Sequence, residues 1–178
     1  MIGVLAVGYG TYRAEGDSLK DGILAALEAG YRHIDTGDDT WCYQLLDWVY
    51  PSAAMYDNEH TVAQAISQSA IPREELFITT KLLPSDQGTI ATTLAIEHSL
   101  KQLQTSYIDL YLIHAPRNNG QSAEEIRRLR QESWMVMEQM HKAGKLRSIG
   151  VSNFNEAHID QVLMSVTMNL DQAADTND

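Results

Sequence analysis

The chain has 178 residues, of which 44% are hydrophobic and 21% charged, a composition typical of a globular domain with material for a sizeable core. Its formal net charge of −11 argues against nucleic acids and anionic membrane surfaces as partners. Cys42 is the single cysteine and cannot form an internal disulfide, and the sequence has no signal-peptide pattern and no apolar run long enough to cross a membrane. We therefore expect a cytoplasmic protein that binds neither nucleic acid nor membrane.

Short apolar runs alternate along the chain with stretches that have the periodicity of amphipathic helices. Capping residues mark several expected helix ends, with Asp17 or Ser18 and Asn58 at amino ends and Gly30 and Gly144 at carboxyl ends. Strands are expected over 4–12, 32–35, 77–81, 108–114 and 148–153, and helices over 17–30, 58–71, 89–103, 126–144 and 156–164. This alternation is typical of a parallel sheet with crossover helices, an α/β fold.

Polar residues with useful chemistry follow these apolar runs: Asp35, Lys81, His114 and the pair 152–153. Because catalytic groups of parallel barrels lie at the carboxyl ends of the strands, we expect these residues to converge there, beside Tyr56 from the loop after the second strand. A nearby ammonium lowers the pKa of a phenol, a carboxylate can orient that ammonium, and an imidazole can hydrogen-bond a carbonyl oxygen. The set indicates a proton donor for a carbonyl group.

Ordered motifs at these positions resemble the aldo-keto reductase family. They are Gly30-Tyr31-Arg32-His33-Ile34-Asp35-Thr36, Tyr56-Asp57-Asn58-Glu59, Thr80-Lys81-Leu82, Tyr107-Ile108-Asp109-Leu110-Tyr111-Leu112-Ile113-His114 and Gly150-Val151-Ser152-Asn153-Phe154. The similarity runs from about residue 5 to about residue 163. It implies a (β/α)8 TIM-type barrel, incomplete here after about the fifth βα unit, and reduction of an aldehyde or ketone with NADPH.

The resemblance also implies roles for individual residues. The family's catalytic tetrad corresponds to Asp35, Tyr56, Lys81 and His114, with Tyr56 as the proton donor. The cofactor-binding set corresponds to Gly10, Thr11, Tyr12, Asp35, Ser152 and Asn153, of which the last two match the pair that holds the nicotinamide carboxamide. The expected partner is a small carbonyl substrate, and no metal site is implied.

The sequence departs from the family's pattern between Asp35 and Tyr56. These residues are 21 positions apart, which is sixteen more than in the family, so we expect an insertion over about 38–54. Within it, residues 41, 45, 48 and 49 have the apolar spacing of one amphipathic helix. Tyr43 and Tyr50 are rival phenols, but only Tyr56 is followed by the family's Asn-Glu pair.

The resemblance also fades towards the carboxyl end, where we expect a divergent tail over about 165–178 in a single partial barrel domain, 1–178. In the family, the last three strands supply the stacking and phosphate contacts of the cofactor. An open parallel sheet leaves unpaired backbone groups at its two edges, which favours self-association or poor solubility.

Two alternatives to a carbonyl reductase remain open. The chain is a noncatalytic fragment or a regulatory module that keeps the half-barrel as an interaction surface, or it is a hydrolase that uses Asp35 and Glu59 as paired carboxylates. The hydrolase hypothesis leaves Lys81 and His114 without a role. The sequence does not identify the substrate.

Overall fold

The computed structural model describes residues 7–37, 57–116 and 122–163, with the side chains of Asp57 and Asn58 left out. The expected insertion at 38–54, with Cys42, lies outside the described residues, and so do Tyr56 and the tail over 165–178.

Five strands alternate with helices along the described chain. In order, the elements are β1 (Tyr9–Gly10), α1 (Gly16–Glu28), β2 (His33–Asp35), α2 (Asp57–Ser69), η3 (Arg73–Glu75), β3 (Phe77–Leu82), η4 (Pro84–Asp86), α3 (Thr89–Gln102), β4 (Leu110–Ile113), α4 (Ala123–Lys142) and β5 (Ile149–Val151), where η marks a short 3-10 helix. Residues 156–163 are also helical. The strands form one sheet in the order β1-β2-β3-β4-β5, and every neighbouring pair is parallel. The predicted α/β alternation is confirmed.

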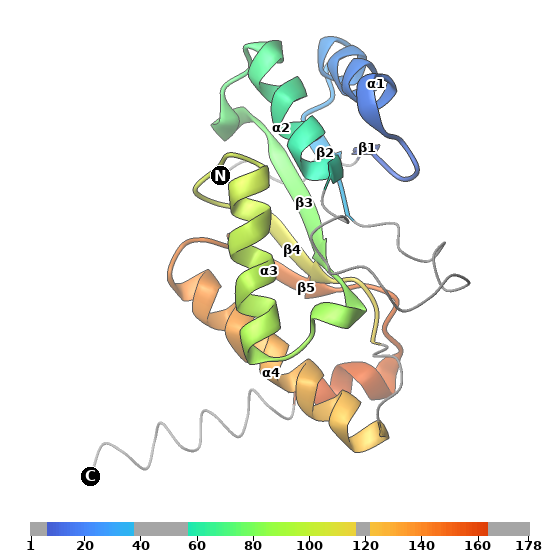
Figure 1. Cartoon of the computed structure of the whole chain (residues 1–178), viewed down its shortest axis with the longest axis vertical. Coiled ribbons are helices and arrows are strands. Elements are labelled where there is room, and N and C mark those ends of the chain that lie inside the picture. The colour runs from blue at the N-terminus through green and yellow to red at the C-terminus, as the bar shows by residue number, and fades with distance from the viewer. Residues whose placement is uncertain (1–6, 38–56, 117–121, 164–178) are drawn as a thin grey trace.

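The hydrophobic core lies between the sheet and the helices. Alternate strand residues such as Ile34, Ile78 and Tyr111 face this core, where they pack with helix residues such as Ile23 and Ile96. In Figure 1, α3 passes in front of β4 and β5 and α4 runs below them, while α1 and α2 lie beside the other end of the sheet. Because successive residues of a strand point to opposite faces, the residues between these core positions face the side of the sheet away from the core.

The helix ends correct two of the predicted caps. The α1 helix begins at Gly16 with Glu15 as its N-cap, so Asp17 lies inside the first turn, where it accepts a hydrogen bond from Lys20 at 2.8 Å. A carboxylate in a first turn interacts well with the helix dipole without capping it. Asn58 lies within α2, which includes Asp57, and is therefore not the cap of that helix.

Other helix boundaries agree with the sequence. Gly30 and Gly144 follow the ends of α1 and α4 with φ of +98° and +76°, the left-handed conformation that closes a helix. The α2 helix ends at Ser69, before Pro72. Ser122 was not predicted as a cap, but its hydroxyl accepts from the Glu125 backbone N–H at 3.2 Å.

Residues 4–6 of the predicted first strand lie outside the described residues, and of the described part, 7–12, only Tyr9–Gly10 form the ladder. A side chain at Gly8 would clash, since its Cβ would lie 2.6 Å from Nδ1 of His33. No helix among the described residues has the length and apolarity needed to cross a membrane.

Candidate active site

The ion pair between Lys81 and Asp35 is the centre of the candidate site. Lys81 is in β3 and Asp35 ends β2, and Lys81 Nζ lies 2.5 Å from Asp35 Oδ1. The same ammonium donates to the Thr36 carbonyl at 2.9 Å. The lysine side chain is 16% exposed and the aspartate side chain 43%, so the pair lies at the surface of the sheet edge with the ammonium more buried. The predicted convergence of these two residues is confirmed.

The backbone around Asp35 forms a compact turn with the end of β1. Gly10 pairs with Asp35 in the ladder, and the Thr11 N–H donates to the Asp35 carbonyl at 3.0 Å. The buried hydroxyls of Thr11 and Thr36 are 3.2 Å apart. Tyr12 follows with 62% of its surface exposed. Gly10, Thr11 and Tyr12 therefore lie at the same sheet edge as the ion pair.

Close approach of the backbone to Lys81 requires a glycine in the next turn. A Cβ on Gly37 would lie 2.8 Å from Lys81 Nζ, too close for a real contact. The absence of that Cβ lets the ammonium reach the Thr36 carbonyl.

His114 joins this edge through its backbone. It directly follows β4, and its N–H donates to the carbonyl of Leu82 in β3 at 3.0 Å. Leu112 pairs with Lys81 in the β3–β4 ladder, so strand alternation places His114, two positions later, on the face that carries Lys81. The sheet thus aligns the ends of β2, β3 and β4 as predicted.

Ser152 and Asn153 follow β5 and are tied to β4. The Ser152 N–H donates to the Ile113 carbonyl at 2.9 Å, and Asn153 Nδ2 donates to the His114 carbonyl at 2.8 Å. Asn153 has φ of +60°, a left-handed conformation that asparagine tolerates better than most residues. A strained residue held by a hydrogen bond to a neighbouring strand end is a feature of functional sites.

The hydrolase hypothesis is wrong in its geometry. Glu59 is buried and its Oε1 accepts from the Thr80 hydroxyl at 2.7 Å, whereas Asp35 is bound to Lys81. Thr80 and Lys81 are adjacent in β3 and point to opposite faces of the sheet. Glu59 and Asp35 therefore lie on opposite faces and cannot act together on one bond.

His33, Phe77 and Thr79 also line the face that carries Lys81. His33 is two positions before Asp35, and a ring nitrogen of its imidazole lies 2.9 Å from the Thr79 hydroxyl. Its ring packs edge-on against Phe77, with centroids 5.2 Å apart. Burial lowers the pKa of His33, an effect that Asp35 opposes and Lys81 reinforces. Strand alternation could have identified His33 from the sequence, because it lies two positions before Asp35 and therefore faces the same side of the sheet.

The proton donor is the part of the site that the described residues do not contain. Tyr56 lies outside them, so its role as proton donor stays a prediction. Tyr111, in the strand beside Lys81, is no substitute because it is fully buried on the core face. Burial raises the pKa of Tyr111, which makes its phenol a poorer acid.

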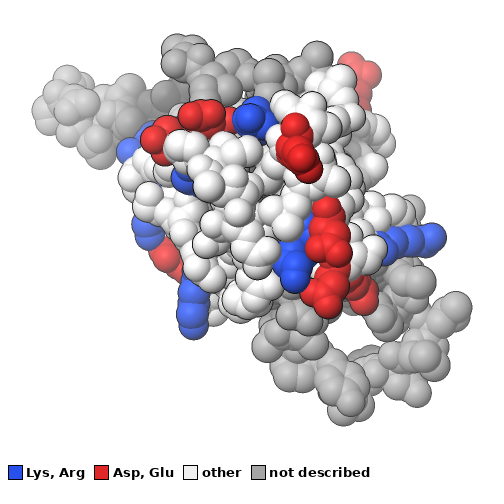
Figure 2. Space-filling model, turned by 90° about the horizontal axis from the view of Figure 1, so that it is seen from above, with Lys and Arg blue, Asp and Glu red and all other residues white. Residues whose placement is uncertain are grey.

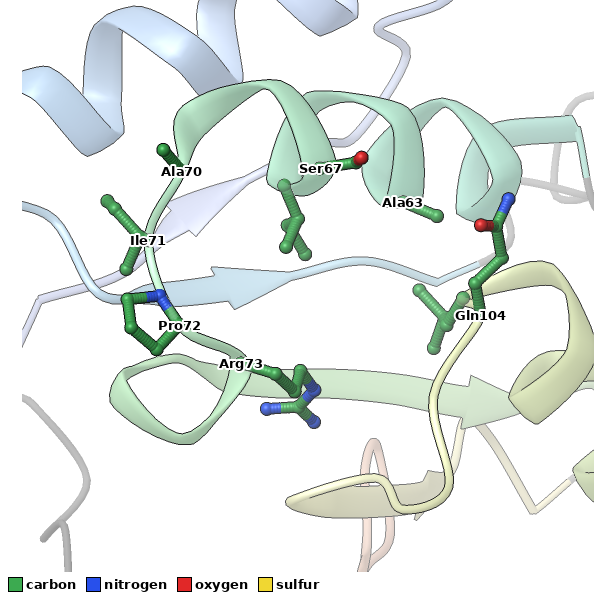
Figure 3. Close-up of a pocket in the computed structure, with 9 residues that line it drawn as sticks. Ala63, Ser67, Ala70, Ile71, Pro72, Arg73 and Gln104 are labelled. Atoms are coloured by element: carbon green, nitrogen blue, oxygen red, sulfur yellow. The ribbon is translucent and has the colours of Figure 1, made fainter.

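The described residues contain a cavity of about 420 Å³ near the amino ends of β3 and β4, away from the carboxyl ends that carry the ion pair (Figure 3). It lies between the carboxyl end of α2 and the residues before β3 and β4, with lining residues that include Ala63, Ala70, Pro72 and Gln104. These residues precede the strands, whereas Asp35 and Lys81 lie at strand ends. The cavity is therefore separate from the candidate active site.

A charged cluster beside this cavity was missed by the sequence analysis. The Asp109 carboxylate accepts from Arg73 at 2.7 Å, from Arg147 at 3.2 Å and from the Ile78 N–H at 3.0 Å. The two guanidinium groups also lie 4.2 and 3.6 Å from the ring centre of Tyr107. The available signal was a carboxylate directly before β4, within the apolar run 108–113, because such groups are seldom buried unless they are paired.

Charged side chains of both signs lie on the surface of the described residues (Figure 2). On the face shown in Figure 2, acidic and basic side chains lie between large uncharged areas. Within 7–37, 57–116 and 122–163, no group of three or more His, Cys, Asp or Glu residues could hold a metal ion.

Comparisons with known proteins agree with this geometry. The model of the aldo/keto reductase family matches residues 1–174. Glyoxal reductase of Bacillus subtilis is 38% identical over 157 residues, which cover 88% of this chain and 48% of that enzyme. The chain thus spans about half the length of the relatives it matches.

Solved structures show the same relationship. An aldo-keto reductase from a Medee basin deep-sea metagenome library is 38% identical with a TM-score of 0.72, over 90% of this chain and 50% of that one. The aldo-keto reductase of Bombyx mori, solved in complex with NADP, is 32% identical with a TM-score of 0.68, over 89% of this chain and 50% of that one. These neighbours are (β/α)8 barrels, and this sheet corresponds to about half of one. The chain belongs to the aldo/keto reductase family.

Proposed function

We propose that this chain provides the catalytic end of an NADPH-dependent reductase that converts an aldehyde or ketone to an alcohol. The observation that carries the proposal is the 2.5 Å pair between Lys81 and Asp35 at the carboxyl ends of adjacent parallel strands. Small dicarbonyl compounds are the first substrates to test, since the Bacillus subtilis relative is a glyoxal reductase.

The described residues fit the nicotinamide end of the cofactor. No atom of the described residues lies within 4 Å of where a Cβ on Gly10 would be, so these residues leave the backbone beside Asp35 open to a ligand. Ser152 and Asn153 lie at the same edge of the sheet, with polar side chains that can bind a carboxamide. Gly10, Thr11, Tyr12, Ser152 and Asn153 are therefore the residues proposed to hold it.

The chemistry of the proposed site divides between its four side chains. Asp35 orients the Lys81 ammonium, and this ammonium favours the phenolate of Tyr56, which makes the phenol a better acid. The His114 imidazole donates a hydrogen bond to the substrate carbonyl oxygen and polarises it. When bound, the nicotinamide cofactor supplies a hydride to the carbonyl carbon. Tyr56 gives its proton to the oxygen, and the alcohol forms.

Turnover with glyoxal and NADPH tests this assignment. Loss of the proton donor in Tyr56→Phe should lower kcat by roughly 100- to 10,000-fold, because general acid catalysis contributes that much, while NADPH affinity stays near the parent value. Equal loss of turnover and of nucleotide binding would show that Tyr56 is structural. A parent chain that folds and binds no nucleotide would support the noncatalytic interaction module.

Two further parts of the proposal concern the state of the chain. We propose a cytoplasmic location, in keeping with a single cysteine and a net charge of −11. We also propose self-association through the edges of the sheet. Sedimentation of the purified chain tests the second point, and a monodisperse monomer that melts cooperatively would contradict it.

A further inference from the structure

Arg130 is a buried cation that the proposed chemistry does not use. It lies in α4 and is only 3% exposed. Among the described residues no carboxylate pairs with it, and its Nε has no hydrogen-bond partner. Burial lowers the pKa of Arg130, because the charge has lost its water. Burying a charge without a counter-ion is costly, so its retention calls for a specific role.

The guanidinium joins two segments that follow neighbouring strands. Its Nη2 donates to the carbonyl of Pro116, two residues after His114, at 2.6 Å. Its Nη1 donates to the side chain of Gln161 at 2.5 Å, and its Cζ lies 5.4 Å from the ring centre of Phe154. A planar group with donors in two directions makes all three contacts at once, which a lysine cannot do.

A second link closes this arrangement into a ring. Phe154 directly follows Asn153, whose amide donates to the carbonyl of His114. The segments after β4 and β5 are thus joined twice: directly after the strands by Asn153, and further along both segments by Arg130 of α4. The Gln131 amide adds a contact to the Gln161 carbonyl at 2.8 Å, which fixes the helical residues 156–163 against α4.

We infer that Arg130 is a positioning residue that locks the segments after β4 and β5 together and so sets the placement of His114 and Asn153. Its effect on the reaction rests on the proposed function, whereas its effect on the two segments does not. Arg130 itself touches no reacting atom and acts through these neighbours.

Hydrogen–deuterium exchange on the full chain tests the inference without any ligand. In Arg130→Met, amides of 110–115 and 149–155 should exchange roughly tenfold faster, as expected when a charged hydrogen bond is lost, while those of α1 keep the parent rate. Gln161→Leu should accelerate the same segments. Arg127→Met is the matched control, because Arg127 lies on the same helix and is exposed; its exchange should equal that of the parent.

The outcomes separate the inference from the proposed function. Equal exchange in Arg130→Met and Arg127→Met would overturn the inference, and so would uniform acceleration that includes α1, since that indicates only lost global stability. Arg130→Lys should behave as Arg130→Met, because it restores the charge but not the two-directional contact, and full recovery of parent exchange by the lysine would also overturn the inference. If the parent binds NADPH, Arg130→Met should weaken binding about tenfold relative to Arg127→Met. If the parent binds none, the proposed function fails while the exchange data still decide the role of Arg130.

Discussion

Removal of the negative charge at Asp109 should destabilise the fold more than any surface change. The Asp109 side chain is 5% exposed and accepts hydrogen bonds from Arg73, Arg147 and the Ile78 backbone. An asparagine keeps the volume but loses the charge and one acceptor oxygen, so Arg73 is left without its counter-ion. Breaking a buried pair costs about 3–5 kcal/mol, and we expect the lower end because the side chains of Arg73 and Arg147 are 20% and 50% exposed.

Urea unfolding followed by far-ultraviolet circular dichroism measures this loss. With a slope of about 2 kcal/mol per molar, a loss of about 3 kcal/mol lowers the midpoint of Asp109→Asn by roughly 1.5 M at unchanged slope. The control is Asp17→Asn, whose partner Lys20 forms an ion pair on the surface and whose side chain is 90% exposed. Its midpoint should fall by less than about 0.5 M, because only an exposed ion pair and a helix-dipole interaction are lost. Equal midpoints for the two variants would refute the assignment of Asp109 as a buried structural anion.

Three smaller changes test other local features. Ala70 follows α2 with φ of +55°, a conformation that glycine adopts without strain, so Ala70→Gly should raise the unfolding free energy by about 1 kcal/mol. The control is Ala29→Gly, at φ of −70°, which should not be stabilised. A destabilised Ala70→Gly would contradict this prediction. Because burial lowers the pKa of His33, the folded state binds the proton less readily than the unfolded state, and stability falls as the pH drops below about 6.5. This loss should be smaller in His33→Gln, and an unchanged pH dependence would exclude His33 as its source. Thr80→Val removes the donor to the buried Glu59 carboxylate and should lower the melting temperature by roughly 4–12 °C, whereas no shift would mean that other groups satisfy this carboxylate.

The order of the strands could be predicted because its signals are local. Each apolar run ends in a polar residue, and right-handed crossovers place consecutive parallel strands side by side. Asp35 and Lys81 lie near the carboxyl ends of neighbouring strands and face the same side of the sheet, so these two rules bring them together. The same alternation separates Glu59 from Asp35, because Thr80 and Lys81 are adjacent in β3 and point to opposite faces of the sheet. Reaching this conclusion also requires knowing that Glu59 of α2 packs against Thr80, which only the structure shows.

Long-range contacts were harder to predict. Arg130 follows Arg127 and Arg128 in sequence and resembles part of a solvated face, yet it lies four positions after Ile126 and three before the buried Ser133. Helical periodicity could therefore have placed Arg130 on the apolar stripe, but its partners come from the segments after β4 and β5 and could not be read from the helix alone. The short ladder of β1 and the close approach of Gly8 to His33 are likewise visible only in the folded arrangement.

Titration of the 178-residue chain with NADPH measures whether the strand ends that carry Asp35, Lys81 and Asn153 bind a nicotinamide nucleotide. We expect saturable binding with a Kd on the order of micromolar, weakened in Lys81→Met. A folded chain that shows no binding at about millimolar NADPH would contradict it.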